Sequence, residues 1–137
     1  MNATDLLIDS IRDYIEATAV TPLSTCSFVL RDQAADRTFP QCRTSERSVE
    51  EHEIVRGAYI AQVDVTLRTI PGDTSDADHQ SIADQLWGII ADVDIHRWLS
   101  QTGSLQVFDV RCSGPMTEPD DDYRSTTFPL RCVYWSQ

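Results

Sequence analysis

Two stretches of the chain place apolar residues three or four positions apart, the spacing of one face of a helix. The first predicts a helix from about Thr4 to Thr18. The second follows a turn at 71–73, and Ser75 with Asp78 makes an approximate capping box at its start. Its apolar stripe is formed by Ile82, Leu86, Ile89 and Val93, and Ile90 widens it. A short helical turn is expected at 95–99.

Other stretches alternate apolar and polar residues, which is typical of strands with one buried face. The clearest alternation runs over residues 56–69. Further strands are expected at 26–31, 105–112 and 125–135. One face of the sheet is therefore expected to be buried and the other mostly exposed to water.

The extended segment from Phe39 toward Val49 is poor in large apolar side chains. We therefore expect residues 32–55 to protrude as a ribbon or loop, and the acidic connection at 113–124 to form a second loop. The element order α-β-β-β-α-β-β predicts an α+β fold, in which two main helices pack on one face of a small antiparallel or mixed sheet. No repeat or linker divides the chain, so residues 1–137 are expected to form a single domain.

The charge balance disfavours two kinds of partner. The chain has 22 acidic and 11 basic residues, giving a net charge of −11. Tight binding to DNA or to an anionic membrane depends on basic residues, so neither is expected. No apolar run is long enough to span a bilayer, and the start of the chain lacks the features of a signal peptide. All basic residues are arginine, which a GC-rich genome or a salty environment would explain.

The four cysteines, Cys26, Cys42, Cys112 and Cys132, contain no CxxC pair. A zinc site is therefore a poor fit, and buried, reduced thiols are the default expectation. A disulfide between Cys112 and Cys132 remains open, because both lie on strands expected to be near each other.

The densest cluster of possible metal ligands is Asp73, Asp76, Asp78 and His79. An EF-hand loop starting at Asp73 would need Gly and Glu where Asp78 and Asp84 stand, so that match fails. A charged, capped helix start explains the cluster better. Phosphate-binding loops, nucleophile elbows and zinc-protease motifs are absent from the sequence. We expect a protein that is not an enzyme, with no catalytic residue, cofactor or metal.

Charged residues on the expected ribbon and acidic loop are candidates for a subunit or partner interface. On the ribbon, arginines and glutamates alternate, and complementary charge fixes the register of an interface. The alternatives are a plain exposed hairpin and a solvated acidic loop. The candidate interface residues are Arg37, Arg43, Glu46, Arg47, Asp120, Asp121 and Asp122.

The order of elements and their local patterns resemble the tail terminator (tail-completion) proteins of long-tailed bacteriophages and related particles. The resemblance covers most of the chain without an invariant motif. It is carried by the helix at 6–15, the strand at 56–67, the helix opening at 73–79, the turn at 94–99 and the strands at 105–111 and 126–135.

The resemblance implies a structural virion protein, assembled in the host cytoplasm, that forms a six-membered ring at the head-proximal end of the tail tube. Such a ring ends tube polymerisation and joins the tail to the head. The implied partners are further copies of the chain, the tail tube protein and the head–tail connector, with DNA passing through the ring. An acidic lumen would repel phosphates, which fits the net charge of −11. The alternatives are another neck or head-completion protein, and a cellular small-molecule or protein-binding module or small enzyme.

Overall fold

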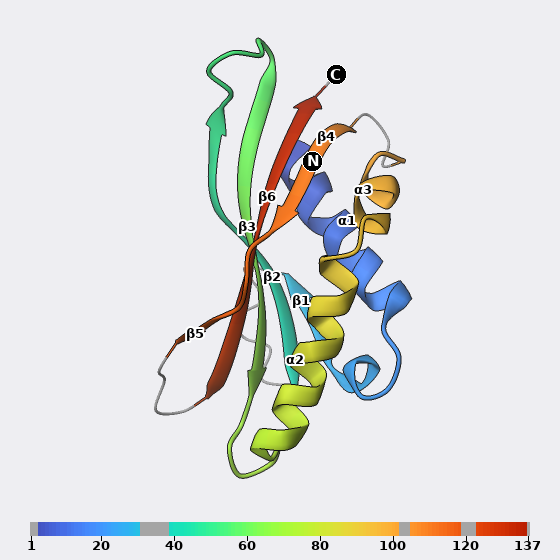
Figure 1. Ribbon diagram of the computed structural model, residues 1–137, viewed down its shortest axis with the longest axis vertical. Coiled ribbons are helices and arrows are strands. Elements are labelled where there is room, and N and C mark those ends of the chain that lie inside the picture. Colours follow the sequence, from blue (N-terminus) through green and yellow to red (C-terminus); the bar gives the residue numbers. More distant parts are fainter. Residues whose placement is uncertain (1–2, 31–38, 102–104, 119–122, 137) are drawn as a thin grey trace.

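The computed structural model describes residues 3–30, 39–101, 105–118 and 123–136. A mixed sheet of six strands has its helices on one face (Figure 1). This arrangement confirms the predicted α+β class.

The helices and strands lie close to their expected positions. They are α1 (Ala3–Thr18), a 3-10 turn (Leu23–Thr25), β1 (Ser27–Leu30), β2 (Gln41–Glu51), β3 (Ala58–Thr69), α2 (Asp76–Ile90), α3 (Asp94–Leu99), β4 (Leu105–Cys112), β5 (Met116–Glu118) and β6 (Arg124–Ser136). The strand β5 was not expected, because it lies inside the acidic connection predicted as a loop.

The sheet is built around two long central strands. Its order is β1-β2-β3-β6-β4, and β5 pairs with β6 beside β4. Strands β1 and β2 run parallel, whereas the other pairs are antiparallel. In β3 and β6, Val65 lies opposite Phe128 and both are buried, so this row of the sheet faces the helices.

The core lies between the helices and the covered face of the sheet. Side chains from α1, α2, β3 and β6 meet there and exclude water, which supplies most of the stabilisation of a domain of this size. Its fully buried members include Leu7, Ile11, Ile15, Leu86, Ile90, Val65, Leu67, Phe128 and Leu130.

The predicted apolar stripe of α2 is wrong at one position. The helix ends at Ile90, and Val93 lies beyond it with 81% of its surface exposed. Ile90, which was expected to widen the stripe, is buried, so the stripe that faces the sheet ends one turn earlier. The exposed Val93 is therefore available to other contacts.

The start of α2 is fixed by the predicted cap. The Ser75 hydroxyl accepts a hydrogen bond from the backbone N–H of Asp78 at 3.1 Å. Replacing Ser75 with alanine leaves that N–H without this partner, so we expect a loss of about 1 kcal/mol in the free energy of unfolding. Ser81→Ala, an exposed change inside the same helix, should cost almost nothing. Urea unfolding of both variants measures the difference, and equal midpoints would contradict the prediction.

The first half of β2 is part of the core, which corrects the expectation of a ribbon without core residues. Gln41, Cys42 and Thr44 are buried, Cys42 belongs to the core, and β2 lies between β1 and β3 at this end. From Glu46 onward the side chains are exposed, and the pairing with β3 shifts between Glu46 and Ser48. The exposed second half extends into the β2–β3 hairpin, which reaches one end of the molecule (Figure 1).

The hairpin loop is held by specific backbone contacts. The Nδ1 atom of His52 accepts hydrogen bonds from the N–H groups of Ile54 and Val55, both at 3.1 Å. Gly57 has a φ of +83°, and a Cβ there would lie 2.7 Å from the Trp135 indole nitrogen. Glycine is therefore required by both the backbone conformation and the close approach of Trp135.

Candidate interaction surfaces

Residues 73–79 contain the cluster of possible metal ligands. In the structure they form the capped start of α2, and the histidine among them is buried. His79 is buried, and its ring nitrogens lie 2.7 Å from the Thr69 hydroxyl and 2.9 Å from the Thr126 hydroxyl. Arg124 pairs with Asp76 at 2.7 Å beside it. In the described part of the chain, no group of three or more His, Cys, Asp or Glu residues is placed to hold a metal ion.

The surroundings of His79 favour its neutral form. Burial is the main cause that lowers its pKa below the ordinary value of 6.5, and the nearby Arg124 lowers it further. The neutral imidazole has one nitrogen that donates and one that accepts, which suits a place between two hydroxyl groups. His79 therefore links β3, α2 and β6 as a structural residue.

This lowered pKa predicts how stability depends on pH. Above about pH 6.5 the histidine is neutral in both states, so its contribution to stability is complete. As the pH falls below that value, the unfolded chain takes up the proton first and unfolding becomes easier. We expect the loss of stability between about pH 7.5 and 5.5 to be smaller in His79→Gln than in the natural chain. Urea unfolding at both pH values measures it, with Gln80→Ala as the control that keeps the original slope; equal slopes in all three would contradict the prediction.

The four cysteines are free thiols. Cys112 and Cys132 lie on the neighbouring strands β4 and β6 without being bonded to each other. Burial raises the pKa of Cys26 and Cys112 to about 11 and that of Cys132 to about 12. Burial also raises the pKa of Cys42. At neutral pH these thiols stay protonated, and the protonated form is a poor nucleophile.

Three of the predicted interface residues lie in the described part of the chain, all of them on β2. Arg37, Asp120, Asp121 and Asp122 lie outside the described residues. On β2, Arg47 pairs with Asp64 of β3 at 2.9 Å. The register places Arg43 opposite Thr66 and Glu46 opposite Val63, on opposite faces of the sheet. The three ribbon residues are therefore divided between two surfaces.

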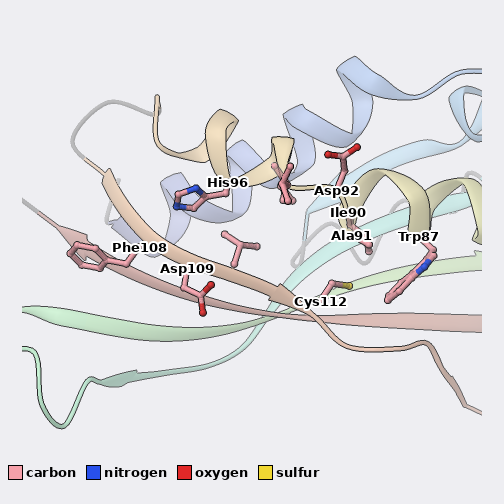
Figure 2. Close-up of a pocket in the computed structure, with 11 residues that line it drawn as sticks. Trp87, Ile90, Ala91, Asp92, His96, Phe108, Asp109 and Cys112 are labelled. Atoms are coloured by element: carbon pink, nitrogen blue, oxygen red, sulfur yellow. The ribbon is translucent and has the colours of Figure 1, made fainter.

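A groove lies between the edge strand β4 and the segment that connects α2 to α3 (Figure 2). Its volume is about 510 Å³, and apolar side chains from both sides line it. In Figure 2, Cys112 points toward the helices, whereas Asp109 points away from them. His96 of α3 closes one end by donating a hydrogen bond from Nε2 to the Val107 carbonyl at 2.7 Å. The exposed apolar residues of this groove are Trp87, Val93 and Phe108, which we call the groove cluster.

A second apolar group lies at the opposite edge of the sheet. Val49, Ile54 and Val55 are exposed on the β2–β3 hairpin, and Ile54 has 88% of its surface in solvent. We call these three residues the hairpin cluster. Large exposed apolar residues are informative when they gather at one place, because such patches often mark interaction sites.

The two edges also carry unpaired backbone. Among the described residues, β4 pairs only with β6, and β1 covers β2 only as far as Thr44. Apart from the Val107 carbonyl, which accepts the hydrogen bond from His96, the outer edge of β4 is therefore free to pair with another strand, and so is the edge of β2 from Ser48 onward. The groove and hairpin clusters stand beside these free edges.

Sequence reasoning missed both clusters. Phe108 sits in a strand whose alternation favours burial of every second residue, but a shift in pairing between Val107 and Asp109 turns it outward. Ile54 follows the acidic residues Glu50, Glu51 and Glu53, in the segment expected to protrude as a ribbon or loop. The apolar residues in the polar segment 50–56 were the available signal for the hairpin cluster.

No protein-family model matches the chain, and no curated protein matches it either. None of the helices in the described residues is long and apolar enough to cross a membrane.

Proposed function

We propose that this chain is a structural virion protein that forms a closed, hexameric ring at the head-proximal end of a phage tail tube. The main support for a ring is that the two opposite edges of the sheet differ from each other and could both contact a neighbouring copy. Each edge combines unpaired backbone with exposed apolar side chains. Burying both edges against neighbouring copies would remove two surfaces that otherwise favour uncontrolled association.

Unlike edges favour head-to-tail association. A contact between two dissimilar surfaces leaves one free surface of each kind, so assembly continues until a ring closes or a filament grows. A ring can close only if the two contact surfaces lie at the same height along the ring axis, because otherwise each added copy would be displaced and a helical filament would form. Phe108 lies between the positions opposite Val133 and Tyr134, and the hairpin leaves the sheet after Glu51, which pairs with Tyr59 in the row of Tyr134. The two clusters therefore stand at the same end of the sheet.

The place of the ring in the particle rests on the resemblance in the order of elements. The α+β class fits that resemblance. The net charge of −11 fits a subunit past which DNA slides without tight binding, because phosphates are repelled by carboxylates. The proposed partners are further copies of the chain, the tail tube protein and the head–tail connector.

Two measurements test this proposal. Electron microscopy of the purified chain with the tail tube protein should reveal rings at one end of each tube. Antibody–gold labelling of whole particles should place the chain at the junction of head and tail. Label on the head side of that junction, on particles that lack tails, would favour another neck protein instead. An abundant chain in the cell with no label on particles would reject the virion role and favour a cellular binding module.

A further inference from the structure

The helices leave one face of the sheet uncovered among the described residues (Figure 1). In β3, Val63, Val65 and Leu67 point toward the helices, so the residues between them point to the other side. Residues paired in register share a face, which extends this assignment to β2, β4, β5 and β6. We call this side the uncovered face.

The uncovered face concentrates positive charge. Among the residues whose side chains the structure describes, five arginines and three acidic residues lie on it, in a chain of net charge −11. Arg47 and Arg111 pair there with Asp64 and Asp109, respectively. The arginines are Arg43, Arg47, Arg68, Arg111 and Arg131, and the acids are Glu50, Asp64 and Asp109.

The helical side of the molecule has the opposite character. From residue 70 to residue 96 no lysine or arginine occurs, and six aspartates do. The helix α1 adds four acids and only Arg12. Charge is therefore segregated between the two sides of the sheet, and the uncovered face is the side that an acidic surface can approach.

Two arginines on this face are held in unfavourable places. Arg131 lies directly opposite Arg111 in the register, and like charges in that relation are destabilising. In the described part of the chain Arg131 has no ion pair or hydrogen bond of its side chain. The Nε atom of Arg68 is buried without a hydrogen-bond acceptor, while its guanidinium lies 5.8 Å from the centre of the Tyr123 ring. Arg131 therefore has hydrogen-bonding capacity that the described part of the fold does not use, whereas the Nε atom of Arg68 is out of reach of a partner.

We infer that the uncovered face is a docking surface for an acidic face of another protein, with Arg111 and Arg131 at its centre. The partner's carboxylates would supply the acceptor that the Arg131 guanidinium lacks among the described residues, and would add to the single ion pair that Arg111 makes with Asp109. A protein fits better than a nucleic acid, because Trp135 and Met116 are exposed among the arginines. Aromatic residues, Met and Arg are enriched together in protein interfaces. The net charge of −11 also repels a polyanionic duplex from the rest of the molecule.

This surface is separate from the two sheet edges proposed to join copies of the chain. A subunit that binds its neighbours by its edges keeps the uncovered face free for a different protein. The inference goes beyond the ring and does not depend on it, so the two can fail independently.

A short all-glutamate peptide is the probe for this surface. Added to the isotope-labelled chain at low salt, it should shift the amide and Arg Nε–H resonances of the uncovered face in NMR spectra. The double variant Arg111→Gln/Arg131→Gln should weaken peptide binding by about tenfold or more, because charge-assisted hydrogen bonds are lost. The matched variant Arg12→Gln/Arg97→Gln removes two arginines from the helical side and should bind as before. At about 1 M salt the shifts should vanish, since screening acts over about 3 Å.

Three results would overturn the inference. The first is a set of shifts on the helices instead of the uncovered face, or no shifts at low salt. The second is equal weakening by both double variants. The third is a different occupant: tighter binding of a DNA duplex than of the peptide, or self-association that is lost in Arg111→Gln/Arg131→Gln. The first double variant removes a like-charge pair, so its thermal stability should equal or exceed that of the natural chain. That measurement excludes misfolding as the cause of lost binding.

Discussion

Phe108→Asp should leave the chain folded and abolish its association into rings. Phe108 is 51% exposed in the single chain, so the substitution removes little from the core. In a ring the same side chain would be buried against a neighbour, where an unpaired carboxylate costs several kcal/mol. Sedimentation velocity measures the assembly state, and thermal unfolding measures the fold. Rings formed by Phe108→Asp would contradict the edge contact.

A second variant makes this prediction sharper. Ile54→Asp alters the hairpin cluster on the opposite edge and should also give single chains. Each variant keeps one intact edge, so a mixture of the two should form one-to-one dimers and nothing larger. Val20→Asp is the control, because Val20 is 62% exposed in the segment after α1 and belongs to neither edge cluster. A mixture that stays monomeric would mean that the two clusters do not meet in one interface.

Phe128→Ala should have the largest effect on stability. Phe128 is 1% exposed, lies opposite Val65 on the covered face, and its ring centre is 5.9 Å from that of Trp87 on α2. Removing a buried phenylalanine loses its transfer free energy and leaves a cavity, at a cost of about 3–5 kcal/mol.

The matched control for this change is Phe108→Ala, which removes the same atoms from an exposed site. Its cost in the free energy of unfolding should stay below about 1 kcal/mol. Chemical denaturation of the two variants gives the comparison. Similar losses in both would mean that Phe128 is not the core residue that joins α2 to the sheet.

Much of the fold could be predicted because its elements have strong periodicity. The alternation from Tyr59 to Leu67 and the helical spacing of Leu7, Ile11 and Ile15 reflect burial on one side of each element. The cap at Ser75 was predictable for a local reason, since its hydrogen bond joins residues three positions apart. These signals depend on neighbouring residues alone.

Other features depend on pairing between distant segments. Gln41, Cys42 and Thr44 are small or polar, so nothing in their pattern indicates a core strand. They are buried where the fold places β2 inside the sheet, between β1 and β3. The same holds for the candidate surfaces. Arg111 and Arg131 are 20 positions apart in the sequence and become opposite neighbours only through the register of β4 and β6.

The separation of charge across the sheet also makes the molecule an electric dipole. The helical side is its negative end and the uncovered face, where arginines outnumber acids, is its positive end, so a nearby charged body exerts a torque as well as a force. A copy diffusing toward an acidic surface would turn its sheet toward that surface before contact. A larger fraction of encounters would then occur in the orientation that allows binding, which raises the association rate. This increase should become smaller as added salt shortens the range of the electric field.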